Sequence, residues 1–123
     1  MPLSYSRDTI SHGTTGVKTM TVGFQPVKAR LVARIAPGSD SPIIFRCEGN
    51  TNGTNQNGDT FTAESTRVYQ RTYTDRMISI SEWNGSAWVE TFKITFDSFT
   101  ATEFKYNVVT ANSGFQLLRE VEG

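Results

Sequence analysis

Histidine and cysteine most often supply nucleophiles, general bases and metal ligands, and this chain has one of each. His12 lies in a Gly- and Thr-rich segment, with no cysteine or second histidine near it in sequence. Zinc sites and histidine-dependent triads need several such groups together, so the sequence argues against both. We expect His12 to be a solvated or hydrogen-bonded loop residue. Cys47 alternates with Phe45 and Ile43, which predicts a buried, unreactive thiol.

Paired carboxylates could also do chemistry, because glycoside hydrolysis needs only two of them, one on each side of the scissile bond. None of the candidates belongs to a catalytic motif: Asp59, Glu64, Asp75, Glu82, Glu90, Asp97 and Glu103. Surface pairing explains them better than catalysis, since Glu82 and Glu90 could face basic residues across a hairpin. The Asn-rich stretch 48–60 lacks the spaced carboxylates of a calcium loop. The sequence therefore predicts no catalytic residue, no metal and no cofactor.

Aromatic rings beside polar side chains are the features best suited to binding a ligand. Tyr69, Tyr73 and Trp83 occur near arginines, and Asn55 lies in the longest polar stretch of the chain. A flat exposed ring offers apolar area, and neighbouring Arg and Asn side chains supply hydrogen bonds. We take these four residues as candidates for binding a glycan or a host surface. A coplanar, exposed pair of rings would favour this role, whereas buried rings would be structural.

The elements that position these side chains are strands, because apolar residues recur with a period of two. Apolar and mostly basic residues alternate from Val27 to Ile35, and Trp88–Phe96 is a half-buried strand with Trp88 on its core face. Met77–Trp83 precedes it, joined through Asn84-Gly85, which favours the two positive-φ positions of a type I′ turn. We expect a hairpin there with four buried side chains: Ile78, Ile80, Phe92 and Ile94.

Weaker strand signals come from β-branched and aromatic residues at 17–22, 42–47, 67–73, 104–110 and 115–121. Residues 1–14 are expected to form an N-terminal arm or an edge strand. The polar stretch 48–60 is expected to be a surface loop or the turn of an extended hairpin. About eight strands and little or no helix predict an all-β fold, an antiparallel β-sandwich or jelly roll, as a single domain over residues 15–123.

Composition limits the partners of this domain. The formal net charge is zero, so there is no long-range field to attract nucleic acid. No apolar run approaches the roughly 20 residues that span a membrane, and the N-terminal residues do not read as a signal peptide. We therefore expect a soluble chain with no nucleic-acid partner and no membrane insertion.

The segment Thr19–Val32, TMTVGFQPVKARLV, resembles the G-F-Q-P-type segment of many tailed-bacteriophage virion proteins, especially tail-fibre and receptor-binding domains. In those proteins too, a strand ends in Gly-Phe-Gln-Pro and a new alternating strand begins. The glycine frees the turn, the phenylalanine anchors it, and the proline fixes φ at the strand entry. A second similarity lies at Phe96–Val108, where Ser98-Phe99-Thr100 replaces the Gly-Phe-Thr of the phage proteins.

The resemblance implies a non-enzymatic structural protein of the virion, either a tail-fibre or a capsid-decoration module. It also implies a homotrimer that contacts other virion proteins of the capsid or tail. Outward-facing apolar residues are expected to form the subunit interface, chiefly Val32, Ile44 and Val89, together with Val109 and Leu118. The alternative is a carbohydrate-binding module that recognises cell-surface glycans, and a hydrolase built on two carboxylates is a third hypothesis.

Overall fold

The computed structural model describes residues 4–38, 40, 43–64 and 66–123. Within these residues the fold is all-β, which confirms the predicted class, with ten antiparallel strands in place of about eight. The part described contains no helix that could cross a membrane. The strands are β1 (Tyr5–Ile10), β2 (Gly16–Thr21), β3 (Lys28–Ile35), β4 (Ile44–Thr51), β5 (Gln56–Glu64), β6 (Arg67–Tyr73), β7 (Ile78–Trp83), β8 (Trp88–Phe99), β9 (Glu103–Thr110) and β10 (Phe115–Glu122).

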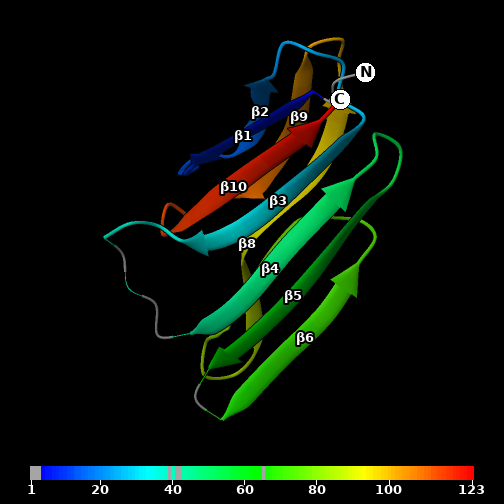
Figure 1. Cartoon of the computed structure of the whole chain (residues 1–123). Coiled ribbons are helices and arrows are strands. Elements are labelled where there is room, and N and C mark those ends of the chain that lie inside the picture. Colours follow the sequence, from blue (N-terminus) through cyan, green and yellow to red (C-terminus); the bar gives the residue numbers. More distant parts are fainter. Residues whose placement is uncertain (1–3, 39, 41–42, 65) are drawn as a thin grey trace.

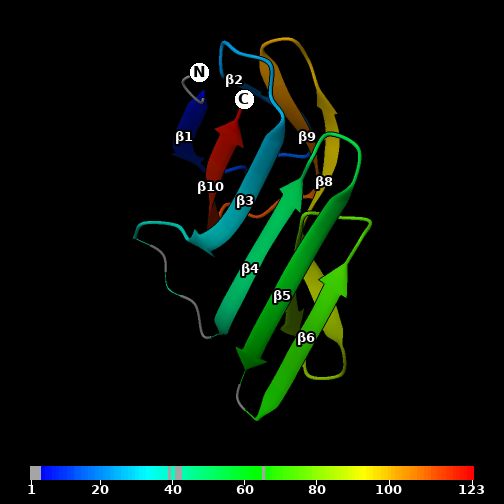
Figure 2. The same cartoon turned by 45° about the vertical axis from the view of Figure 1, so that its right-hand side comes forward.

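The strands form two layers (Figures 1 and 2). A six-stranded sheet has the order β1-β10-β3-β4-β5-β6, and a four-stranded sheet behind it has the order β2-β9-β8-β7. Residues 5–10 thus form an edge strand of the larger sheet, paired with β10. The core between the layers is made of large apolar side chains, with Leu31, Phe92, Phe104, Tyr106 and Leu117 fully buried.

The β7–β8 hairpin forms as predicted, and Ile78, Ile80, Phe92 and Ile94 are fully buried. Its turn differs from the expected two-residue form, because residues 84–87 separate the paired residues Trp83 and Trp88. Asn84 occupies the first turn position, where its Oδ1 accepts hydrogen bonds from the backbone N–H groups of residues 86 and 87, both at 2.9 Å. Gly85 then adopts the positive φ of +100°.

A bulge in β8 overturns the predicted core position of Trp88. Ile80 lies opposite Phe92, but the next residue, Ser81, lies opposite Glu90, so β8 carries one extra residue. An extra residue reverses the alternation of faces beyond it. Trp88 therefore leaves the face that carries Phe92 and is only half-buried, outside the main core.

The polar stretch 48–60 is the extended-hairpin form of the two predicted structures, because only residues 52–55 connect β4 to β5. Gly49 and Gly58 lie directly opposite one another in this hairpin. The backbone of Arg76 and Met77 crosses so close that a Cβ on Gly49 would lie 2.0 Å from the Met77 carbonyl oxygen. One further expectation was wrong: Val27 precedes β3 and is exposed, while its N–H donates to the Glu122 carbonyl.

Candidate functional site

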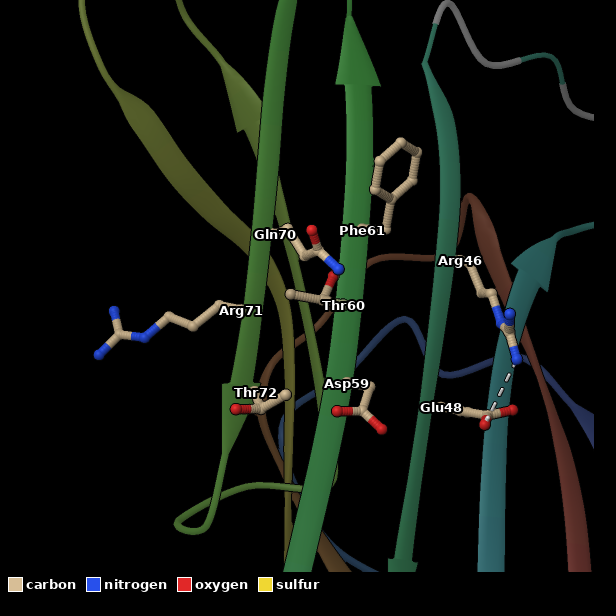
Figure 3. A pocket seen from close by; sticks show the side chains of 8 residues that line it. All are labelled: Arg46, Glu48, Asp59, Thr60, Phe61, Gln70, Arg71 and Thr72. Carbon is tan, nitrogen blue, oxygen red and sulfur yellow. Dashed lines mark ion pairs between the residues drawn. The ribbon is translucent and has the colours of Figure 1, made fainter.

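A hollow lies on the outer face of the six-stranded sheet, over β4, β5 and β6 (Figure 3). Its volume is about 460 Å³. The strand register arranges the lining in two rows, Arg46–Phe61–Gln70 and Glu48–Asp59–Thr72. Phe61 therefore has a planar polar side chain on each side. The full lining is Arg46, Glu48, Asp59, Thr60, Phe61, Gln70, Arg71 and Thr72.

The charges that line the hollow are balanced. Glu48 accepts a hydrogen bond from Arg30 at 2.7 Å and lies 3.8 Å from Arg46. Asp59 lies directly across the strand pair from Glu48 and has no ion pair within the described residues. Arg71 points away from the hollow (Figure 3). The two acidic side chains are therefore balanced by Arg46 and by the Arg30 that pairs with Glu48.

A third row, Ile44–Ala63–Val68, continues the same outer face at the end of these strands. Ile44 is 72% exposed and Val68 is 61% exposed. The sheet is antiparallel, and its other face already covers the core, so this outward row has no strand or helix packed over it among the described residues. Val68 was not among the predicted interface residues, although its alternation with Arg67 and Tyr69 indicates that it lies on the opposite face of the strand from them.

The predicted interface residues do not form one patch. Val32 lies opposite Leu118 on the outer face of the six-stranded sheet, and Ile44 belongs to the same sheet. Val89 and Val109 lie instead on β8 and β9 of the four-stranded sheet. An alternating pattern identifies the outward positions of each strand, but the order of strands decides which positions become neighbours.

The predicted ligand-binding rings pack against one another between β6 and the β7–β8 hairpin. The Tyr69 and Trp88 rings lie 5.4 Å apart at 43°, and Trp83 meets Trp88 edge-on at 67°. The Arg67 guanidinium lies 3.9 Å from the Trp83 ring centre. Tyr73 is buried, and its hydroxyl lies 3.0 Å from that of Tyr69. These rings join the two sheets, and none of the ring pairs among the described residues is coplanar and exposed.

Asn55 is not brought together with these rings. It lies in the β4–β5 turn, whereas Tyr69 lies opposite Thr62, far along β5. At about 3.3 Å per residue the two positions are roughly 23 Å apart. The four predicted residues therefore do not make a single site.

His12 is buried and hydrogen-bonded, one of the two environments expected for it. Its Nε2 lies 2.5 Å from the hydroxyl of Tyr106, which accepts a hydrogen bond from Arg119 at 3.1 Å. Arg119 also donates two hydrogen bonds to Asp8, at 2.7 and 2.5 Å. Burial, together with Lys18 and Arg119, lowers the pKa of His12 to about 4. These hydrogen bonds connect Asp8 on β1 to the buried Tyr106, and they occupy the Nε2 atom of His12.

Cys47 is buried, as predicted, and its thiol donates a hydrogen bond to the Ser79 carbonyl at 3.4 Å. Burial raises the pKa of the thiol to about 11, which opposes formation of the nucleophilic thiolate. Among the carboxylates, Glu90 pairs with Arg76 at 2.6 Å, a partner in the β6–β7 connection and not across the hairpin. The described residues contain no group of three or more His, Cys, Asp or Glu side chains placed to hold a metal ion.

No protein-family model, curated protein or solved structure matches this chain. The function of this chain must therefore be inferred from its own residues, including the segment Thr19–Val32. In that segment Gly23 has a φ of +77°, Phe24 packs against the core, and Pro26 is buried. Gly23 and Phe24 thus have the local roles expected of them in this turn.

Proposed function

We propose that this chain is a non-enzymatic structural protein of a tailed-bacteriophage virion, a tail-fibre or capsid-decoration module that assembles with copies of itself and with other virion proteins. The observation that carries the proposal is the open outer face of the six-stranded sheet, with the exposed row Ile44–Ala63–Val68. The Gly-Phe-Gln-Pro segment supplies the phage assignment. Its resemblance implies an assembly of three copies, while the free edge of β6 is suited to an assembly of two copies.

Burial energetics support assembly through this face. Fully burying a Val or Ile side chain is worth about 1.5–3 kcal/mol, so covering Ile44 and Val68 together contributes several kcal/mol. Isolated exposed apolar residues are common and carry little weight. Here two of them share one row with Ala63, beside the hollow that contains Phe61, and a grouped patch is the sign of an interaction surface.

The virion assignment is tested on the phage that encodes the chain. An antibody raised against the purified protein should label intact particles at one structure, tail or capsid, in immunogold electron microscopy. Mass spectrometry of particles purified through a density gradient should detect the chain at a fixed stoichiometry to the major capsid protein. If particles lack the chain while the infected-cell lysate contains it, the virion proposal is wrong.

The hollow favours a second function, recognition of a neutral cell-surface glycan. Phe61 offers a ring for stacking on a sugar, while Arg46 and Gln70 can donate and Asp59 can accept hydrogen bonds. Balanced charge gives no preference for an anionic ligand. The volume of about 460 Å³ is within the range of ligand pockets.

A glycan array screened with the purified chain tests this second function, followed by NMR titration of any ligand found. Phe61→Ala should abolish the chemical-shift changes. Tyr5→Ala is the matched control, because Tyr5 is an exposed ring on β1, at the far edge of the same sheet. No binding on the array, or equal loss in both variants, would contradict a glycan site in the hollow.

A further inference from the structure

The free edge of β6 is unusually regular. β6 is the last strand of the six-stranded sheet, and β5 is the one strand paired with it among the described residues. Its register with β5 is unbroken from Arg67 to Tyr73, without a bulge or a proline. Natural proteins usually interrupt, shorten or cover such an edge, because its unpaired N–H and C=O groups are a template for another strand. β6 therefore offers a surface for strand addition.

The sequence of β6, RVYQRTY, is complementary to itself when reversed about its centre. We propose that β6 pairs antiparallel with β6 of a second copy of this chain, about a two-fold axis at Gln70. Arg67 then faces the second copy's Tyr73, and Arg71 faces its Tyr69. Val68 faces Thr72, and Gln70 faces Gln70. This inference rests on the self-assembly of the proposed function and adds a contact at the edge of the same sheet.

Electrostatics select this register over its neighbours. A two-fold axis normal to the sheet pairs residues whose side chains point to the same face of the sheet. The two paired residue numbers must therefore both be even or both be odd, and the nearest alternative registers are centred on Tyr69 and on Arg71. A shift in one direction places Arg67 opposite Arg71, and a shift in the other places Arg71 opposite Arg71. Like charges directly opposite on paired strands are destabilising. The register centred on Gln70 avoids both contacts and is the longest of the three.

The pair of Arg71 with the second copy's Tyr69 stabilises the selected register. Arg67, by contrast, already lies over Trp83, and Tyr73 is buried. Directly opposed residues have Cβ atoms about 5 Å apart, which puts a guanidinium within the roughly 6 Å reach of a ring. Arg71 is fully exposed, and Figure 3 shows it pointing away from the other side chains that line the hollow. It already lies 4.9 Å from the Tyr73 ring of its own strand, so the contact with a ring is one that this side chain makes.

The pairing also gives a neighbour to Val68, the residue of the exposed outer row that lies at the sheet edge, and leaves Ile44 on the open outer face. It joins the two six-stranded sheets into one continuous sheet, and it places Val68 beside Thr72 of the second copy. The row Ile44–Ala63–Val68 then meets the second copy's row Thr72–Asp59–Glu48, and the two hollows become neighbours on one face. An exposed valine at a free edge acquires a neighbour, and the backbone groups of the edge acquire hydrogen-bond partners.

Charge variants at the axis test the pairing. Gln70 is exposed, so Gln70→Lys and Gln70→Glu should fold, which far-UV circular dichroism checks. Each variant alone places two like charges face to face, and sedimentation velocity should show dimerisation weakened by up to about fivefold. A mixture of the two should recover the dimer as a heterodimer. Thr19→Lys, on the exposed face of β2 in the other sheet, is the matched control and should leave dimerisation unchanged.

Disulfide trapping tests the register directly. Gln70→Cys should cross-link with itself under oxidised glutathione, because directly opposed Cα atoms on antiparallel strands lie about 4.5–5.5 Å apart. Thr72→Cys should not, since its two copies would be about 13 Å apart along the strands. Cross-linking at 72 but not at 70, or an assembly indifferent to both charge variants, would overturn the β6 pairing and leave self-assembly through another surface in place. A wild-type chain that stays monomeric would overturn self-assembly as well.

Discussion

Replacing Gly49 with alanine should destabilise the fold more than any other single methyl group added to a glycine of the two sheets. The new Cβ would lie 2.0 Å from the Met77 carbonyl oxygen, 2.5 Å from its carbon and 2.6 Å from its Cα. All three are backbone atoms, so no side-chain rotation relieves the contact. Overpacking a core costs about 1–3 kcal/mol, and a clash with backbone should reach or exceed the upper value.

The opposing effect is smaller. Alanine reduces the conformational freedom of the unfolded chain, which is worth about 0.4–1 kcal/mol. The net loss should therefore be about 2 kcal/mol or more, measured by urea unfolding followed through tryptophan fluorescence. Gly58→Ala should behave similarly, because its Cβ would lie 2.6 Å from the same oxygen. Gly13→Ala is the control, with its nearest contact an ordinary 3.6 Å. If Gly49→Ala is as stable as Gly13→Ala, the close crossing of Met77 over the hairpin is wrong.

Three further predictions concern buried polar groups. Burial lowers the pKa of His12 to about 4, so the unfolded chain binds more protons between pH 6.5 and 4. The free energy of unfolding should therefore decrease as the pH is lowered from 6.5 to 4, by at most about 3.4 kcal/mol. His12→Gln should flatten that slope in urea titrations, and an unchanged slope would contradict the role of His12. Cys47 should resist a thiol reagent at pH 8 until the chain unfolds, because burial raises the pKa of its thiol to about 11; rapid labelling of the folded protein would show otherwise. Thr62 is fully buried, and its hydroxyl has no hydrogen-bond partner in the described part of the chain. Thr62→Val should therefore leave the free energy of unfolding unchanged or raise it by up to about 1 kcal/mol in urea titrations. A clear decrease would contradict an unpaired hydroxyl.

Local patterns in the sequence were sufficient for the fold class and for much of the strand content. Alternation predicted β3 and the buried face of β8, because a strand with one face on the core must repeat every second residue. Asn84-Gly85 predicted the hairpin between β7 and β8. The Trp88 prediction failed, since a single bulged residue reverses the alternation and leaves no mark in the residue types.

Other features depend on contacts between distant parts of the chain. Gly49 and Gly58 read as loop residues in a polar stretch, and only the path of Met77 over the hairpin explains them. The bridge from Asp8 to Arg119 joins β1 to β10, at opposite ends of the sequence. The free edge of β6 could not be predicted from the sequence for the same reason. The self-complementary sequence of β6 gains meaning only when β6 is known to be the free edge of its sheet.

The native mass of the unmodified chain tests self-assembly most directly. Sedimentation equilibrium of the purified full chain from micromolar to millimolar concentration should show a concentration-dependent approach to twice the 13.7 kDa chain mass. A limit of three chain masses would keep the assembly but contradict the two-fold β6 pairing. A constant mass of 13.7 kDa over the whole range would contradict self-assembly itself.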